Sequence, residues 1–240
     1  MKKLLFIINP MAGRQQAQTD LYKMVKIFAD HDYEVTVYPT RARLDCTRKV
    51  LEDAGRFDLV VCCGGDGTLN EMVSGMMQRQ DRRPMGYIPL GSTNDLAVSL
   101  RLPTRVEEAA LRAVTGNEFH MDVGTLNDRY FNYIAAFGAF TETSYATPQE
   151  IKNALGHLAY ILEGVKSLGK ILPIHVKITA DDEQFEEDYL FGAVTNTISL
   201  GGVLKLDPEK VLLDDGMYEL LLVKNPTNAL EAQAMLTALM

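Results

Sequence analysis

A carboxylate stands among three glycines in the run Gly64-Gly65-Asp66-Gly67-Thr68. The run follows an apolar stretch, 57–63, and precedes a helical pattern, so it lies at the exit of a buried strand. Glycine lets main-chain N–H groups approach a phosphate without side chains in the way. Asp66 would repel that phosphate unless a cation lay between them, and a magnesium-bound nucleoside triphosphate meets this condition. An ordinary strand-to-helix turn, with Asp66 or Thr68 as the helix cap, is the alternative interpretation.

Two further loops have the same context of a strand, a turn and a helix. The apolar strand 4–8 runs into residues 9–13, and the strand 85–90 runs into residues 91–97. In the second of these loops, Ser92 or Thr93 can cap the next helix and offer a hydroxyl to a nucleotide. In a parallel sheet with helical crossovers, the carboxyl ends of the strands lie along one edge. The three loops are therefore expected to converge on one crevice.

Three motifs in this order and spacing resemble the bacterial diacylglycerol kinase family, which is related to sphingosine kinases. They read Asn-Pro-x-Ala-Gly from residue 9, Gly-Gly-Asp-Gly-Thr-Leu-Asn-Glu from residue 64, and Pro-Leu-Gly-Ser-Thr-Asn-Asp from residue 89. Segments 121–124 and 213–216 are also similar to that family, so the likeness runs from residue 9 to about residue 223. The resemblance implies ATP- and Mg²⁺-dependent phosphorylation of a lipid hydroxyl. Diacylglycerol is the favoured acceptor, which gives a lipid phosphate such as phosphatidic acid.

The same resemblance implies a set of nucleotide-binding residues, in which Asp66 is also the catalytic residue that faces the magnesium nucleotide. The set is Asn9, Pro10, Met11, Ala12, Gly13, Thr40, Gly64, Gly65, Asp66, Gly67, Thr68, Leu69, Asn70 and Ser92. Without the resemblance, Thr40 at the end of the strand 33–39 is better interpreted as a turn hydroxyl. Arg41, Arg43, Arg48 and Lys49 follow it, and a solvated helix face is favoured over an anion site for this basic cluster.

A second magnesium site, structural in role, is implied near residue 215. By resemblance to the family, the ion is held by the side chain of Asp215 and by the main-chain carbonyls of Leu212 and Met217. Hard oxygen ligands around a tight turn suit magnesium. The alternative interpretation is a hairpin with Asp-Gly in its turn.

The hydrophobic pattern changes along the chain and predicts two domains. Strands and helices alternate up to about residue 122, which indicates an α/β nucleotide-binding domain with a parallel sheet. From residue 123 to 240 the pattern is mainly of strands, and the resemblance implies an antiparallel, sandwich-like domain. The expected helices are 15–30, 44–54, 69–79, 94–100, 107–114 and an insertion at 148–168. The expected strands are 4–8, 33–39, 57–63, 85–90, 129–134, 175–179, 185–195 and 217–223.

Charge and composition exclude some partners. Twenty-four basic against 32 acidic residues give a net charge of −8, which argues against nucleic acid and against a broad polybasic membrane surface. The apolar run at 4–8 is too short for a signal peptide, and no stretch approaches the roughly 18 residues of a membrane helix. The three cysteines have no metal or redox spacing. We expect a cytoplasmic protein, peripherally associated with the inner face of the membrane that holds its lipid substrate; a homodimer is left open.

Two other functions remain as alternatives. One is an enzyme similar to NAD kinases, which share the Gly-Gly-Asp-Gly-Thr turn but act on a soluble acceptor. The other is a non-catalytic, regulatory nucleotide-binding protein. The resemblance implies an acidic catalytic base in an Asp-Gly-Glu-like segment. This segment would follow the region of likeness, and none occurs before Met240. Because an apolar stripe from Ala232 to Met240 also stops without a helix-ending signal, a truncated chain is expected.

Overall fold

The chain divides into two compact units, which are described separately. The computed structural model describes residues 1–138, 172–201, 204–226, 228, 230–231 and 234. The first unit comprises Met1–Tyr133 with Leu213–Asp215, and the second comprises Ile134–Leu212 and Gly216–Met240. The predicted helical insertion at 148–168 and the apolar stripe at the C-terminus lie outside the described residues. The domain boundary near residue 122 stays a prediction.

A four-stranded parallel sheet forms the centre of the first unit. Its strands are β1 (Lys2–Ile8), β2 (Tyr33–Pro39), β3 (Leu59–Gly64) and β4 (Met85–Pro89), in the order β2-β1-β3-β4. β1 pairs with β2 along its whole length and with β3 over its last five residues, from Leu4 to Ile8. Helical crossovers connect the strands, as parallel pairing requires. The predicted α/β class is confirmed.

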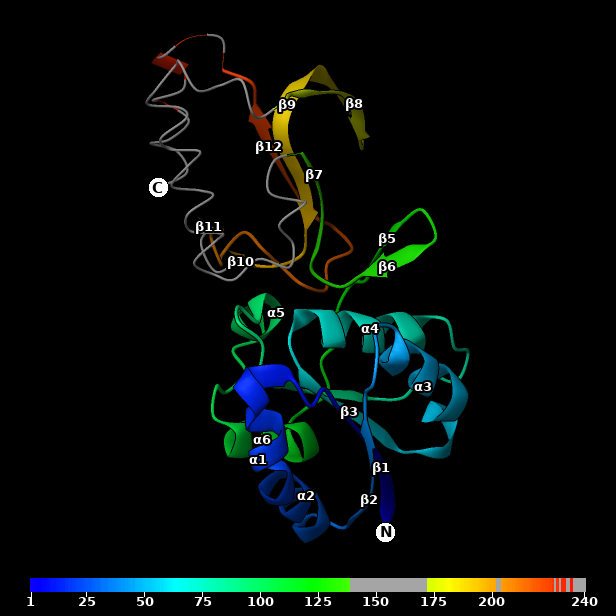
Figure 1. The fold of residues 1–240 in the computed structure, drawn as a ribbon. Helices are drawn as coiled ribbons and strands as arrows, with labels where there is room; N and C mark the ends of the chain where they lie inside the picture. The colour runs from blue at the N-terminus through cyan, green and yellow to red at the C-terminus, as the bar shows by residue number, and fades with distance from the viewer. Residues whose placement is uncertain (139–171, 202–203, 227, 229, 232–233, 235–240) are drawn as a thin grey trace. The chain divides into compact units, whose positions relative to one another are not determined.

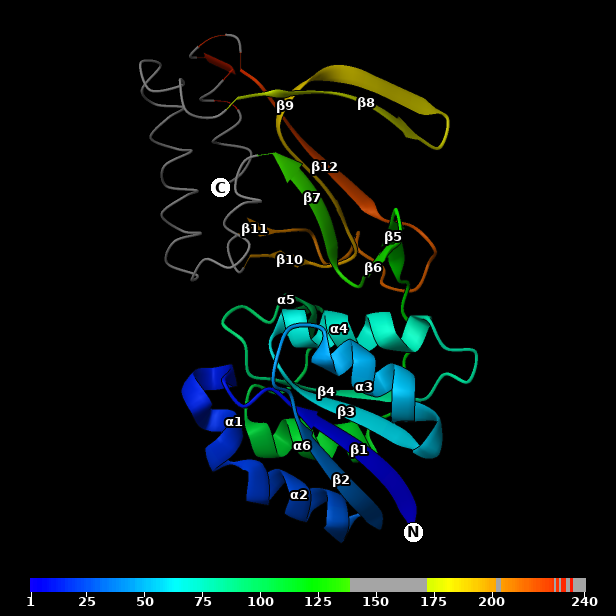
Figure 2. The same cartoon turned by 45° about the vertical axis from the view of Figure 1, so that its right-hand side comes forward.

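Helices cover both faces of this sheet, as Figure 1 and Figure 2 show. They are α1 (Gln16–Thr19), α2 (Leu21–Asp30), α3 (Asp45–Asp53), α4 (Asp66–Met77), α5 (Asp95–Ser99) and α6 (Val106–Thr115), with short 3₁₀ turns η1 (Ala12–Gln15) and η2 (Ala54–Arg56). Alternate residues of a strand point to opposite faces. Phe6 therefore packs with α2 and α6, whereas Ile7 packs with α3 and α4. No helix within the described part of the chain has the length and apolar character of a membrane span.

One predicted helix is wrong in its extent. The helical pattern over 15–30 is divided in the structure into η1, α1 and α2, with Asp20 between the last two. Asp20 has φ −97° and ψ 3°, and its carboxylate accepts hydrogen bonds from Gln16 and Lys23. Main-chain hydrogen bonds continue across Asp20, from its N–H to the Gln16 carbonyl at 3.0 Å and from the Met24 N–H to its carbonyl at 3.2 Å, so the break is a local change of ψ rather than a loss of these bonds. The spacing of apolar residues is unchanged across Asp20, so the sequence pattern did not indicate a break there.

The second unit contains an antiparallel sheet organised around one long strand, which confirms the predicted antiparallel class. Strand β9 (Glu183–Thr195) pairs with β8 (Ile174–Ala180) through its first half. Its second half pairs with β7 (Ile134–Gly138) on one side and β12 (Glu219–Lys224) on the other. β10 (Ser199–Leu200) and β11 (Leu204–Lys205) form a separate short pair. The β5 (Gly124–Leu126) and β6 (Arg129–Phe131) hairpin belongs to the first unit.

The three cysteines are free thiols inside the first unit. Cys46, Cys62 and Cys63 are all buried, and burial raises their pKa values, that of Cys63 to about 12. Only the thiolate is nucleophilic, so a buried thiol with a raised pKa reacts slowly. We expect Ellman's reagent to label none of them in the native protein at pH 8 and all three after denaturation. Rapid labelling of a native thiol would contradict this packing.

Candidate functional site

Four loops follow the carboxyl ends of the four parallel strands. They are residues 9–13 after β1, residues 40–44 after β2, the turn at Gly65 between β3 and α4, and residues 90–94 between β4 and α5. Because the strands are parallel, these ends lie along one edge of the sheet (Figure 2). The structure thus places every predicted nucleotide-binding residue from Asn9 to Ser92 at or next to this edge. Their roles stay predictions.

The three glycines at the β3–α4 turn are explained by different features of the structure. A Cβ at Gly64 would collide with the side chain of Thr68, and a Cβ at Gly65 would stand 3.1 Å from the Cα of Gly91. Close packing therefore favours glycine at both positions, most strongly at Gly64. Gly67, in the first turn of α4, has no atom within 4 Å of its added Cβ. Packing therefore leaves this glycine unexplained, whereas a bound group that needs its surface would explain it.

The N-terminus of α4 carries no side-chain cap. Gly65 is the N-cap residue, and no side-chain capping hydrogen bond is made there among the described residues. The first N–H groups of a helix lack partners within the helix and carry the positive end of its dipole. A phosphate at this point would satisfy them. The sequence prediction of a phosphate-binding turn is consistent with this geometry.

One carboxylate oxygen and one amide oxygen on α4 have no hydrogen-bond donor among the described residues. Asp66 accepts from the Thr93 hydroxyl through Oδ2 at 3.0 Å, but its Oδ1 is buried and unpartnered. Asn70, one turn later, donates from Nδ2 to the Tyr130 carbonyl at 3.5 Å, and its Oδ1 is also buried and unpartnered. A buried acceptor without a donor costs free energy. Residues four apart on a helix are neighbours, and hard oxygens are the ligands that magnesium prefers.

Hydrogen bonds tie two of the other loops, 9–13 and 90–94, to the β3–α4 turn. Asn9 Nδ2 approaches Thr68 Oγ1 at 3.5 Å. Gly91 and Asn94 bond to each other in both directions, at 2.7 and 2.9 Å, and Asn94 has a left-handed φ of 53°. The Tyr87 hydroxyl lies 3.3 Å from the Gly64 carbonyl and 3.1 Å from Asn94 Oδ1. The loops are therefore held in place before any ligand binds.

Sequence reasoning missed Tyr87 as a residue of this site. The tyrosine lies in a strand pattern, where its type indicates core packing. Burial, and then the nearby negative charge of Asp66, raise the pKa of Tyr87, so its hydroxyl keeps its proton and donates at neutral pH. The pKa of Tyr133 is raised in the same way, first by burial and then by the negative charges of Asp66 and Asp95. Asp95, the last residue of the third motif, is 2% exposed.

The remaining predicted contacts are placed in different ways. In the first loop, Gly13 has φ +60°, a conformation that favours glycine, and Asn9 Oδ1 accepts from the Met11 N–H at 3.0 Å. Thr40 continues the β1–β2 pairing, since its N–H donates to the Ile8 carbonyl at 2.9 Å and its hydroxyl turns to the same carbonyl. Leu69 is buried in the core, so a ligand would meet only its main chain. Pro10, Ala12 and Ser92 lie in the loops at the edge.

The basic cluster after Thr40 is largely neutralised. Arg48 pairs with Asp45 at 2.6 Å and with Glu52 at 2.8 Å, and Lys49 pairs with Asp53. The Arg48 guanidinium is the main cause that lowers the pKa of Asp45. These are mostly pairs within one helix at spacings of three and four. The geometry agrees with the favoured interpretation of a solvated helix face.

The predicted metal residues near 215 occupy one short exposed segment. Leu212, Asp215 and Met217 are exposed, and Gly216 between them has φ +77°. Leu213 is buried, and its carbonyl accepts from the Asp122 N–H at 2.8 Å. Within the described residues, no group of three His, Cys, Asp or Glu side chains is placed to hold a metal. The expected set, with one carboxylate and two carbonyls, is of another kind and stays a prediction.

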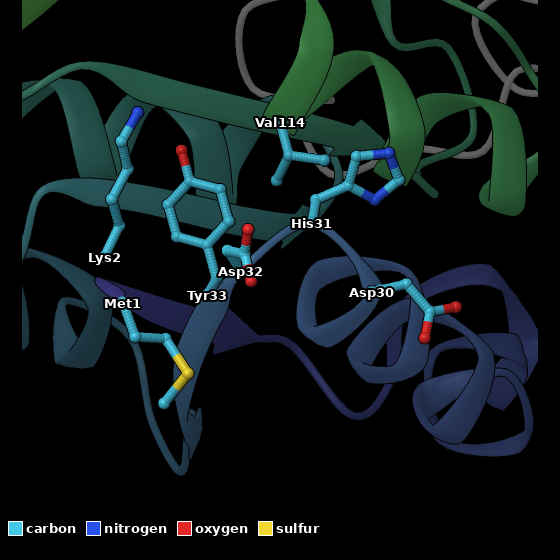
Figure 3. A pocket seen from close by; sticks show the side chains of 7 residues that line it. All are labelled: Met1, Lys2, Asp30, His31, Asp32, Tyr33 and Val114. Carbon is cyan, nitrogen blue, oxygen red and sulfur yellow. The ribbon is translucent and has the colours of Figure 1, made fainter.

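A hollow of about 670 Å³ lies away from these loops. Figure 3 shows that Lys2, His31 and Tyr33 are among the residues lining it. Lys2 and Tyr33 begin β1 and β2, so the hollow is at the amino ends of these strands. His31 directs Nδ1 to the Ile27 carbonyl at 2.8 Å. The hollow is therefore at the opposite edge of the sheet and is separate from the candidate site.

Comparisons with known proteins agree with this site. Residues 3–126 match the family described as Diacylglycerol kinase catalytic domain. The chain is 37% identical over 226 residues to the Diacylglycerol kinase of Bacillus subtilis (strain 168), covering 93% of this chain and 74% of that protein. It is 34% identical over 226 residues to the Diacylglycerol kinase of Staphylococcus epidermidis (strain ATCC 12228 / FDA PCI 1200), covering 93% and 71%. A solved structure of a diacylglycerol kinase from Bacillus anthracis str. Sterne has a TM-score of 0.74 and 28% identity, covering 98% of this chain and 76% of that one. With its loops, its sheet order and these relatives, the chain belongs to the diacylglycerol kinase family.

Proposed function

We propose that this protein is a lipid kinase that uses ATP and Mg²⁺ to phosphorylate the hydroxyl of diacylglycerol, giving phosphatidic acid. Its family supports a kinase, and the candidate site supports the nucleotide. The observation that carries the proposal is the pair of buried, unpartnered oxygens, Asp66 Oδ1 and Asn70 Oδ1, beside the uncapped N-terminus of α4. Positive helix end and hard oxygens together suit a phosphate with its metal ion.

Each residue of the site has a task in this proposal. The first N–H groups of α4, next to Gly65, bind phosphate oxygens. Asp66 and Asn70 hold the magnesium ion, which when bound neutralises charge that develops on the transferred phosphoryl group. The Thr93 hydroxyl donates to Asp66 Oδ2 and so fixes the direction of its carboxylate. Phosphoryl transfer depends mainly on such positioning and charge stabilisation.

A transfer assay tests the activity. The purified protein is incubated with labelled ATP and Mg²⁺, with diacylglycerol in mixed micelles in one sample and NAD in another. We expect label in phosphatidic acid only. Label in NADP would support an NAD-kinase-like enzyme instead. When the assayed protein carries the Asp-Gly-Glu-like segment that the family resemblance implies beyond residue 240, nucleotide binding without transfer to either acceptor would favour a non-catalytic regulatory protein. Either result would contradict the proposal.

We also propose that the protein works in the cytoplasm, at the inner face of the membrane, as a peripheral protein. The three free thiols agree with a reducing compartment, and a diacylglycerol acceptor resides in the bilayer. We expect the protein to co-sediment with vesicles that contain diacylglycerol. It should not bind tightly to vesicles of zwitterionic phospholipid that lack diacylglycerol. Equal recovery in the supernatant with and without vesicles would contradict this. The oligomeric state is left open between a monomer and a homodimer, and light scattering on the purified protein distinguishes the two.

The structural ion at Asp215 is proposed as well. An ion that binds only the folded state raises stability by mass action, about 2.7 kcal/mol at 100 times its Kd, which corresponds to several degrees in Tm. Magnesium without nucleotide should therefore raise Tm, and Asp215→Ala should abolish that increment. Asp214→Ala is the matched control, because Asp214 is the neighbouring exposed carboxylate. Equal magnesium shifts in all three proteins would show that Asp215 holds no ion.

A further inference from the structure

Glu71 on α4 makes contacts that the candidate site does not yet use. Its carboxylate leaves the helix sideways and accepts two main-chain hydrogen bonds from the start of α3. Oε1 accepts from the Leu44 N–H at 2.8 Å, and Oε2 accepts from the Cys46 N–H at 3.3 Å. The Glu71 carbonyl also accepts from the Thr47 hydroxyl at 2.9 Å. One residue of α4 therefore holds the first turn of α3 at three points.

Helix α3 has no cap of its own, which gives these contacts their importance. Its N-cap residue is Leu44, whose side chain makes no capping hydrogen bond and is 60% exposed. Leu44 also has φ +66°, a left-handed conformation that a non-glycine residue seldom adopts. Ser, Thr, Asn or Asp normally supply the capping oxygen. Here Glu71, from another helix, supplies it and places a negative charge at the positive end of α3.

The same contacts fix the loop that carries Thr40. At its beginning, residues 40–44 are held by the hydrogen bond between the Thr40 N–H and the Ile8 carbonyl. In the middle, the Arg41 N–H donates to Asp45 Oδ2 at 2.9 Å. At the end, Glu71 holds Leu44. Since Glu71 is five residues after Asp66 on the same helix, it links this loop rigidly to the β3–α4 turn.

We propose that Glu71 is a positioning residue for the nucleotide: it caps α3 from outside and holds the Thr40 loop at a set place relative to Asp66. This inference rests on the proposed nucleotide-binding function. Glu71 itself touches neither phosphate nor acceptor. Its effect is to order the loop before the nucleotide arrives, so that binding does not have to supply the ordering free energy.

Hydrogen exchange and nucleotide affinity test the proposal together. Glu71→Ala should speed amide exchange in residues 40–46 and raise the Kd and KM for ATP about fivefold, which corresponds to about 1 kcal/mol, while kcat changes little. Glu71→Gln keeps one acceptor oxygen and should show intermediate exchange and affinity. The control is Glu52→Ala, which removes an exposed carboxylate of α3 whose ion pair, within the described part of the chain, is with Arg48 on the same helix. It should change neither quantity.

The possible results separate the proposals. Faster exchange with unchanged ATP affinity in both Glu71 variants would overturn the positioning role, and so would unchanged exchange in residues 40–46. A lower Tm with a normal KM would also overturn it, because a merely structural residue gives that result. If the unaltered protein binds no nucleotide, the proposed function fails and this inference fails with it. Binding by the unaltered protein and equal binding by the variants would overturn this inference alone.

Discussion

Asp66→Asn is expected to lower magnesium-dependent ATP binding, and the turnover that depends on it, by about 100-fold or more. The amide has the shape of the carboxylate but lacks its charge, and loss of even an indirect metal contact typically costs about 10-fold to 100-fold in affinity or activity. The fold should survive, because the Thr93 hydroxyl can bond to either atom of the new side chain. Calorimetric titration with ATP, with and without Mg²⁺, measures the change, and Tm checks the fold.

Asp81→Asn is the matched control for this substitution. Asp81 is an exposed carboxylate that follows the other end of α4 and pairs with Arg79. Removing its charge should leave ATP affinity within error of the unaltered protein. If Asp66→Asn binds magnesium nucleotide and turns over as the unaltered protein does, Asp66 is not the residue that faces the metal.

Gly67→Ala is expected to separate binding from folding. Nothing lies within 4 Å of the added Cβ, and alanine is preferred over glycine within a helix by roughly 0.8–1.0 kcal/mol. The variant should therefore be at least as stable as the unaltered protein. A Cβ among the N–H groups of the first turn would hinder a phosphate, so ATP affinity should fall by about 10-fold to 100-fold, or about 1.4–2.8 kcal/mol. Thermal melting and ATP titration on the same preparation measure both effects.

Gly91→Ala gives the contrasting result. Its Cβ would stand 2.6 Å from the Cα of Gly65, a main-chain atom that cannot move without shifting the β3–α4 turn. Overpacking of this kind typically costs about 1–3 kcal/mol, so Tm should fall together with ATP affinity. A Gly67→Ala protein that binds ATP normally would show that the glycine at this position does not serve phosphate approach.

Patterns among residues close together in the sequence predicted much of the fold of this protein. The strand before Gly64, the helix after Thr68 and the change of period toward the second half are local patterns, so they were readable along the chain. The α/β class and the placing of three loops at one sheet edge follow from them, whereas the antiparallel class of the second unit came from the family resemblance. The motif order carried the family resemblance, which the relatives confirm.

Tertiary structure decided which residues hold these loops together. The contact that favours glycine at Gly65 and Gly91 joins segments far apart in the chain, as does the bond from Glu71 to Leu44. Tyr87 reaches the Gly64 carbonyl only because β4 lies beside β3, where Pro89 pairs with Gly64. A pattern of apolar spacing states which side of a helix or strand is buried, but not which distant segment covers it. That depends on strand order and register, and these are set when the packed sheet forms.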